Sequence, residues 1–155
     1  MNYRKLGTTD LEVSTICLGT MTWGEQNTKE DAFEQMNYSF DKGVNFFDTA
    51  DVYGDGRSEK FVGELIKSTS EKIFVTTKSG RRLNPHNAEG YNLKNIEGFI
   101  DRSLINLGID CIDLLQLHCP PSEICPKKET YGMMDEIVKK GKKANYGVSV
   151  EKVSE

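Results

Sequence analysis

Short apolar runs alternate with amphipathic segments along this chain, and this alternation restricts the possible folds more than any other feature. The apolar runs lie at residues 16–18, 44–47, 72–77, 112–117 and 146–148, and their lengths and composition are typical of buried strands. The segments between them carry apolar residues three or four positions apart, as one face of a helix requires. Strand, helix and strand with a step of roughly thirty residues form the βαβ unit of a parallel sheet.

Capping residues mark where the helices begin and end. Side chains that can cap a helix N-terminus precede three amphipathic segments, namely Thr28, Ser58 and Asn92. Glycines that can close a helix in the left-handed conformation follow three of them, namely Gly43, Gly108 and Gly141. We also predict a hairpin from residues 3–6 and 11–14, a helix around 134–138 and the start of another helix at Glu151.

Polar residues stand where the predicted strands end. They are Asp48, Lys78, His118 and Ser149, and Tyr53 follows Asp48 by five residues. A doubly wound sheet and a (β/α)8 barrel both fit the pattern, and periodicity does not separate them. In both folds the carboxyl ends of the strands face one mouth, so we predict that these side chains converge there.

A tyrosine, a lysine, an aspartate and a histidine at one mouth can together protonate an oxyanion during carbonyl reduction. A free tyrosine has a pKa of about 10, and a neighbouring ammonium group lowers that pKa. An aspartate beside the lysine keeps the ammonium charged and in place, and a histidine can donate a hydrogen bond to the carbonyl oxygen. The hydride itself has to come from a cofactor.

Several motifs, in the same order along the chain, are similar to one family. The stretch 43–54, GVNFFDTADVYG, resembles the signature of the aldo-keto reductases, as do VTTK, LLQLHCP and the opening YRKLG and LGTMTWG. The resemblance implies parallel β/α units of a TIM barrel: strands one to five of eight, with an N-terminal β-hairpin. Residues 1–155 would then be the N-terminal portion of a single, incomplete barrel domain.

The same resemblance implies roles for individual residues and a cofactor. Tyr53 would be the general acid, Asp48 and Lys78 would tune it, and His118 would orient the carbonyl group of a small-molecule substrate. The cofactor would be NADPH in preference to NADH, although no GxGxxG fingerprint follows any strand. The implied cofactor-binding residues are Gly19, Thr20, Met21, Asp48 and Ser149, and the implied substrate-binding residues are Trp23, Tyr53 and His118. Val150 stands where the family commonly has asparagine, which weakens the expected contact of Ser149 with the carboxamide.

Each of these residues also has a simpler interpretation. Trp23 can be a core residue, Lys78 a solvated lysine at a strand end and Asp48 a turn residue. His118 with Cys119 and Cys125 suggests zinc, but the spacing matches no usual zinc site.

Other charged or titratable residues are expected in loops. We interpret His86 as a surface-loop residue. Arg57, Arg81 and Arg82 are interpreted as solvated loop charges rather than phosphate ligands.

Charge and cysteine usage exclude several classes of function. The net charge of −4 argues against a nucleic-acid or anionic-membrane surface. The four cysteines follow no disulfide framework, which indicates reduced thiols in a cytoplasmic protein. No apolar stretch is long enough to cross a bilayer.

The length of the chain bears on its function. A (β/α)8 barrel needs about 250 residues, so 155 residues predict a truncated barrel with open edges at its first and fifth strands. We expect self-association through those edges.

One functional hypothesis is an NAD(P)H-dependent reductase of aldehydes or ketones, in which this segment carries the catalytic tetrad but has little activity alone. The other is a catalytically inactive truncated relative that serves as a cofactor-binding or assembly module.

Overall fold

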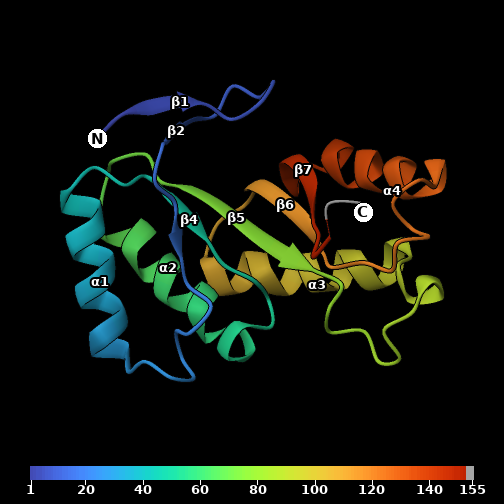
Figure 1. Cartoon of the computed structure of the whole chain (residues 1–155), viewed down its shortest axis with the longest axis horizontal. Helices are drawn as coiled ribbons and strands as arrows, with labels where there is room; N and C mark the ends of the chain where they lie inside the picture. The colour runs from blue at the N-terminus through green and yellow to red at the C-terminus, as the bar shows by residue number, and fades with distance from the viewer. Residues whose placement is uncertain (153–155) are drawn as a thin grey trace.

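Five parallel strands form one sheet in the order in which they occur in the chain. In the computed structural model, which describes residues 1–152, they are β3 (Leu18–Gly19), β4 (Phe46–Asp48), β5 (Phe74–Ser79), β6 (Ile112–His118) and β7 (Lys143–Ser149). An antiparallel hairpin precedes them, made of β1 (Tyr3–Lys5) and β2 (Glu12–Ser14). The helices are α1 (Lys29–Asp41), α2 (Arg57–Ser68), α3 (Leu93–Leu107) and α4 (Lys128–Lys139), with short 3₁₀ turns η1 (Tyr53–Gly56) and η2 (Ala88–Gly90) (Figure 1). This arrangement confirms the predicted parallel β/α units with an N-terminal hairpin.

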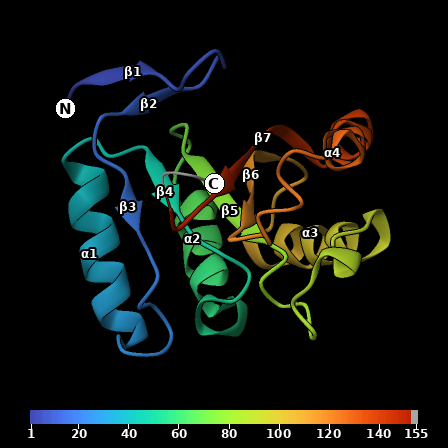
Figure 2. The ribbon, with the colours of Figure 1, turned by 45° about the vertical axis from the view of Figure 1, so that its right-hand side comes forward.

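Two apolar clusters hold the sheet from opposite faces. The helices pack on one face, where Phe47 and Leu115 are fully buried. Successive strand residues point to opposite faces, so Phe46 faces the other side. There it packs with Leu11 and Val13 from the hairpin region. Figure 2 shows the hairpin lying across the end of the sheet at which the strands begin. The other end of the sheet is left to polar residues.

Two of the predicted helix caps are confirmed at α1 and α3. The Thr28 hydroxyl accepts a hydrogen bond from the Asp31 N–H (3.1 Å), while the Asp31 carboxylate accepts one from the Thr28 N–H (3.0 Å). This reciprocal pair satisfies two donors that the start of a helix leaves free. Asn92 caps α3 by accepting from the Asn95 N–H (3.1 Å), and Gly108 ends that helix with a φ of 66°.

The prediction that Ser58 caps α2 is wrong. The helix begins at Arg57, directly after the left-handed Gly56, and Ser58 lies inside its first turn. The Ser58 hydroxyl turns toward the strands instead, where it donates to the Thr20 carbonyl oxygen (3.1 Å) and lies 3.0 Å from the Thr49 hydroxyl. The buried polar groups at the strand ends thus engage the side chain that a helix end would otherwise use.

Several strand limits also differ from the prediction. The first strand is shifted to Leu18–Gly19, because Ile16 lies in the crossover from the hairpin with 60% of its surface exposed. β5 begins at Phe74 rather than at Lys72, whose ammonium group pairs with Asp113 (3.1 Å). β7 is longer than expected and spans Lys143–Ser149. The helix expected from residue 151 onward falls largely outside the described residues.

The two edges of the sheet are β3 and β7, as predicted. Val148 in β7 and Val150 just beyond it keep 43% and 41% of their surfaces exposed. Self-association through these edges stays a prediction. Within residues 1–152, no helix has the length and apolar character needed to span a membrane.

Candidate active site

The carboxyl ends of the strands bring the predicted polar residues to one edge of the sheet. Asp48 ends β4, Lys78 lies one residue before the end of β5, His118 ends β6 and Ser149 ends β7. The strand register places His118 directly beside Ser149. Tyr53 opens η1, five residues beyond Asp48, and its side chain meets the same group of residues.

Lys78 is the centre of this group. Its side chain is buried, with 6% of the residue exposed, and its ammonium nitrogen contacts the Asp48 carboxylate. The same nitrogen donates to the Thr49 carbonyl oxygen (3.0 Å) and lies 3.4 Å from the Tyr53 hydroxyl. A buried ammonium needs such partners because its desolvation is costly. The simpler interpretation of Lys78 as a solvated lysine is therefore wrong.

His118 is also a neighbour of Tyr53. The two rings are 5.9 Å apart between centroids and meet edge to face at 89°. Burial, together with the positive charges of Lys78 and Arg81, lowers the pKa of His118 to about 4. The imidazole is therefore neutral at pH 7, the state in which one ring nitrogen donates and the other accepts. The buried Nδ1 has no hydrogen-bond partner among the described residues.

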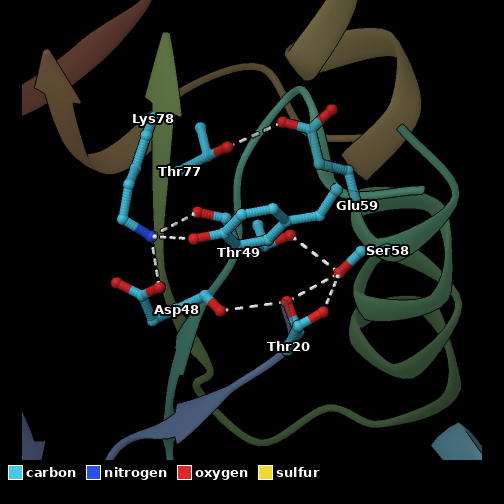
Figure 3. A network of polar contacts seen from close by, with 8 residues as sticks. Thr20, Asp48, Thr49, Ser58, Glu59, Thr77 and Lys78 are labelled. Carbon is cyan, nitrogen blue, oxygen red and sulfur yellow. Dashed lines mark hydrogen bonds and ion pairs between the residues drawn. The ribbon is translucent and has the colours of Figure 1, made fainter. Parts of the chain in front are cut away.

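A buried hydroxyl network fixes the strand ends to α2 (Figure 3). The Thr20 hydroxyl donates to the Asp48 carbonyl oxygen (2.9 Å) and lies 2.6 Å from the Ser58 hydroxyl, which also contacts Thr49. These contacts join β4 and the residue after β3 to the first turn of α2. Asp48 is thus held through its backbone as well as through Lys78.

Sequence reasoning missed two buried carboxylates beside this network. Glu59 is fully buried, where it accepts hydrogen bonds from the Thr77 hydroxyl (2.7 Å) and the Asn106 amide (2.8 Å). Asp51 is also fully buried, and neither of its carboxylate oxygens has a partner among the described residues. Burial, and then the negative charge of Glu59, raises the pKa of Asp51 to about 7.

A sequence signal for Glu59 existed. Glu59 precedes Val62 and Leu65 at intervals of three, so it lies on the apolar face of α2. A charged residue on a buried helix face requires a polar partner inside the fold.

The residues implied for cofactor binding lie around the same edge. A side chain added at Gly19 would meet nothing within 4 Å, and Met21 keeps 64% of its surface exposed. Open space over Gly19, next to Asp48 in the register, fits the approach of a flat ring. Ser149, which is partly exposed, lies at the same edge of the sheet at the end of β7. The Thr20 hydroxyl, in contrast, is already used by the internal network.

Trp23 is placed in the hydrophobic core. Only 1% of its surface is exposed, and its indole N–H donates to the Gln35 side chain of α1 (3.2 Å). These contacts are those expected for core packing. A role of Trp23 in substrate binding stays a prediction.

The loop residues His86, Arg81 and Arg82 differ in their exposure and in their polar contacts. His86 is exposed, with its ring nitrogen 2.8 Å from the Tyr91 hydroxyl. Arg81 lies 3.4 Å from Glu151. The interpretation of Arg82 as a solvated charge is wrong, because Arg82 donates to the Asp51 carbonyl oxygen (2.9 Å) and contacts the Asp55 carboxylate.

In the part of the chain that the structure describes, no group of three or more His, Cys, Asp or Glu side chains could hold a metal ion. All four cysteines are free thiols.

Together, the fold and the site define a class of protein. Parallel β/α units of the TIM-barrel type carry a buried Lys–Asp pair, a tyrosine hydroxyl and a neutral histidine at the carboxyl ends of their strands. In this fold those ends hold the active site.

Comparison with known proteins identifies the family. The model of the aldo/keto reductase family matches residues 15–155, so the chain belongs to that family. It is 35% identical over 152 residues to YqkF, an uncharacterized oxidoreductase of Bacillus subtilis. The matched region covers 96% of this chain and 49% of YqkF.

Solved structures agree with this assignment. The chain is similar to the aldo-keto reductase AKR11C1 from Bacillus halodurans with a TM-score of 0.84 and 32% identity, over 97% of this chain and 50% of that one. An aldo-keto reductase from Klebsiella pneumoniae, solved in complex with NADPH, gives a TM-score of 0.75 and 26% identity over 92% and 48% of the two chains. The chain thus spans about half the length of the relatives that it matches.

Proposed function

We propose that the protein carrying this chain is an oxidoreductase that reduces aldehydes or ketones to alcohols, with Tyr53 as the general acid. The observation that carries the proposal is the position of the Lys78 ammonium, which lies 3.4 Å from the Tyr53 hydroxyl and also contacts the Asp48 carboxylate. A tyrosine hydroxyl has a readily transferable proton only when the phenolate left behind is stabilised, and an adjacent ammonium provides that stabilisation.

Each residue of the site has a separate proposed role. A bound reduced nicotinamide cofactor supplies the hydride, and NADPH is proposed in preference to NADH because a related structure was solved with NADPH. The neutral His118 ring donates a hydrogen bond to the carbonyl oxygen and thereby favours the negative charge that develops there. Tyr53 transfers its hydroxyl proton to that oxygen. Lys78 stabilises the resulting phenolate, and Asp48 holds Lys78 in place.

The space over Gly19, next to Asp48, is the proposed place for the nicotinamide ring, and Met21 and Ser149 are proposed as further contacts of the cofactor. The free thiols are consistent with a cytoplasmic location, which we also propose.

The substitution Tyr53→Phe tests this proposal in the protein at its natural length. We expect the turnover of a reactive aldehyde such as p-nitrobenzaldehyde to fall by about 10² to 10⁴-fold, the usual contribution of a general acid. NADPH affinity, followed through cofactor fluorescence, should stay close to that of the unchanged protein. Tyr38→Phe is the matched control, because Tyr38 is 67% exposed on α1. Unchanged turnover in the Tyr53→Phe variant would eliminate Tyr53 as the acid.

A cofactor-binding or assembly module without catalysis is the second candidate. Its support is the exposed apolar surface at both sheet edges, where Ile16 and Val148 keep 60% and 43% of their surfaces exposed. Two measurements together separate the two functions: a titration of the 155-residue chain with NADPH, and the aldehyde assay on the protein at its natural length. Tight NADPH binding by the chain, without aldehyde turnover by the protein, would favour the module.

A further inference from the structure

The loop that carries Tyr53 has an unusual backbone. Three consecutive residues after the tyrosine are left-handed: Gly54 with φ 55°, Asp55 with φ 55° and Gly56 with φ 87°. Glycine takes this conformation freely, but a residue with a Cβ does so only at a cost in free energy. Aspartate tolerates it better than most residues do. The conformation of Asp55 therefore needs contacts that hold it in place.

Two arginines from distant elements supply those contacts. Arg102 of α3 donates from one nitrogen to both the carbonyl and the carboxylate oxygen of Asp55, each at 2.8 Å. Arg82, which follows β5, contacts the same carboxylate oxygen and donates to the Asp51 carbonyl oxygen (2.9 Å). We call Asp55, Arg82 and Arg102 the Asp55 clasp. The hydrogen bonds from Arg102 and Arg82 lower the pKa of Asp55 to about 2, so the carboxylate stays charged at neutral pH.

The other side of the loop is closed by backbone. A Cβ added at Gly54 would lie 2.7 Å from the Trp23 carbonyl oxygen, so the loop packs directly against the turn at Trp23 and Gly24. The Gly54 N–H also donates to the Glu25 carboxylate (3.2 Å). Tyr53 is thus attached to a loop that is held from both sides, by the clasp and by this turn.

We propose that Asp55, Arg82 and Arg102 are positioning residues that set the Tyr53 hydroxyl relative to the Lys78 ammonium. This inference rests on the proposed role of Tyr53 as the general acid. The Asp55 side chain is 73% exposed, and exposed ion pairs contribute little to overall stability. The clasp acts instead on local geometry, where a displacement of about 1 Å can lower a rate by about 10²-fold.

The first test uses Asp55→Gly, which keeps a left-handed backbone without strain and removes the carboxylate. We expect kcat for p-nitrobenzaldehyde to fall by about 10- to 100-fold, with KM and the thermal unfolding temperature close to those of the unchanged protein. Asp55→Asn keeps an oxygen acceptor and should lose less. Glu97→Gln is the control, because Glu97 of α3 also pairs with two cations, Lys140 and Lys142, which lie between α4 and β7.

A double-mutant cycle separates positioning from a general loss of structure. In a Tyr53→Phe background, Asp55→Gly should cause almost no further loss, since the group that the clasp positions is gone. An equal loss in both backgrounds, or an unchanged kcat in the single variant, would overturn the proposal. If Tyr53→Phe itself leaves turnover unchanged, the proposed function fails, and the clasp proposal with it, because no acid remains to be positioned.

A second measurement does not depend on turnover. Hydrogen exchange at the backbone amides of Tyr53, Gly54 and Asp55 should accelerate at least about 10-fold in Asp55→Asn but stay unchanged in Glu97→Gln, since only the first variant weakens the clasp. Exchange that is equally slow in both variants would show that the clasp does not hold the loop. Arg82→Lys adds a check on another role of the arginines: a large loss of NADPH affinity would show that Arg82 serves the cofactor and would also contradict the proposal.

Discussion

Two buried lysines occupy opposite ends of the same sheet, and their surroundings differ. Lys78 lies near the carboxyl end of β5, where a carboxylate, a carbonyl oxygen and a tyrosine hydroxyl surround its ammonium group. Lys143 is the first residue of β7 and only 1% exposed, and its nitrogen has no hydrogen-bond partner among the described residues. It lies 4.0 Å from the centre of the Tyr146 ring.

The two ends of the sheet differ in the polar groups that they offer to a buried lysine. Burial lowers the pKa of Lys143 to about 8, because nothing at that end compensates fully for lost hydration. At the mouth, Asp48 and the loop after it provide opposite charge and acceptors for Lys78. The carboxyl end of the sheet thus provides polar partners for the lysine ammonium group, whereas the other end buries a lysine without such partners.

The strongest test of this comparison replaces each lysine in turn. Lys78→Met should lower aldehyde turnover by about 10² to 10⁴-fold, because it removes the charge next to the proposed proton donor, Tyr53. Lys143→Met should leave turnover close to normal. Steady-state kinetics on both variants provide the check, and equal losses in the two would remove the distinction between the two ends.

The stability of the Lys143→Met variant gives a second, smaller effect. The pKa of Lys143 falls from 10.5 to about 8 on folding, so the folded state binds its proton less tightly than the unfolded state does. The stability associated with this group is therefore complete above pH 10.5 and is lost as the pH falls toward 8. Unfolding by denaturant between pH 8 and 10.5 should show this dependence in the unchanged protein and a flatter profile in Lys143→Met. A variant with the same slope would mean that Lys143 is solvated.

The smallest effect is expected at the carboxylates beside the mouth. Glu59→Gln keeps the shape of the side chain but replaces one of the two acceptor oxygens that serve Thr77 and Asn106 with an NH2 donor, at a cost of about 1 to 2 kcal/mol. Removing the negative charge of Glu59 should also bring the pKa of Asp51 down from about 7. Carboxyl carbon NMR titration measures that pKa directly. An Asp51 titration that does not move would show that burial alone sets it.

The parallel sheet and the central residues were accessible from sequence because strand ends are marked locally. Four of the five apolar runs end at a polar residue, and parallel strands place those ends together, so Asp48, Lys78 and His118 were predicted at one mouth. Tyr53 was found by its distance from Asp48 and by resemblance to a family. Its contact with Lys78 is what the structure adds.

The supporting contacts were not accessible because they join residues far apart in the chain. Arg102 lies 47 residues from Asp55, and the left-handed backbone of Asp55 has no signature in a single sequence. Ser58 was misplaced as a cap because a serine before an amphipathic segment usually is one. Only the buried hydroxyls of Thr20 and Thr49 reveal its other use.

The enclosure of Lys78 has a consequence for the proposed reduction of aldehydes. A free amine condenses with an aldehyde to an imine, and desolvated lysines next to other cations are the ones that do so readily. The Lys78 amine instead faces the Asp48 carboxylate and the Thr49 carbonyl oxygen, which occupy the positions that an incoming carbonyl carbon would need. Lys143, the amine better suited to such condensation, lies at the far end of the sheet and is inaccessible. Under the proposed function, Lys78 can therefore lie beside a carbonyl substrate without condensing with it.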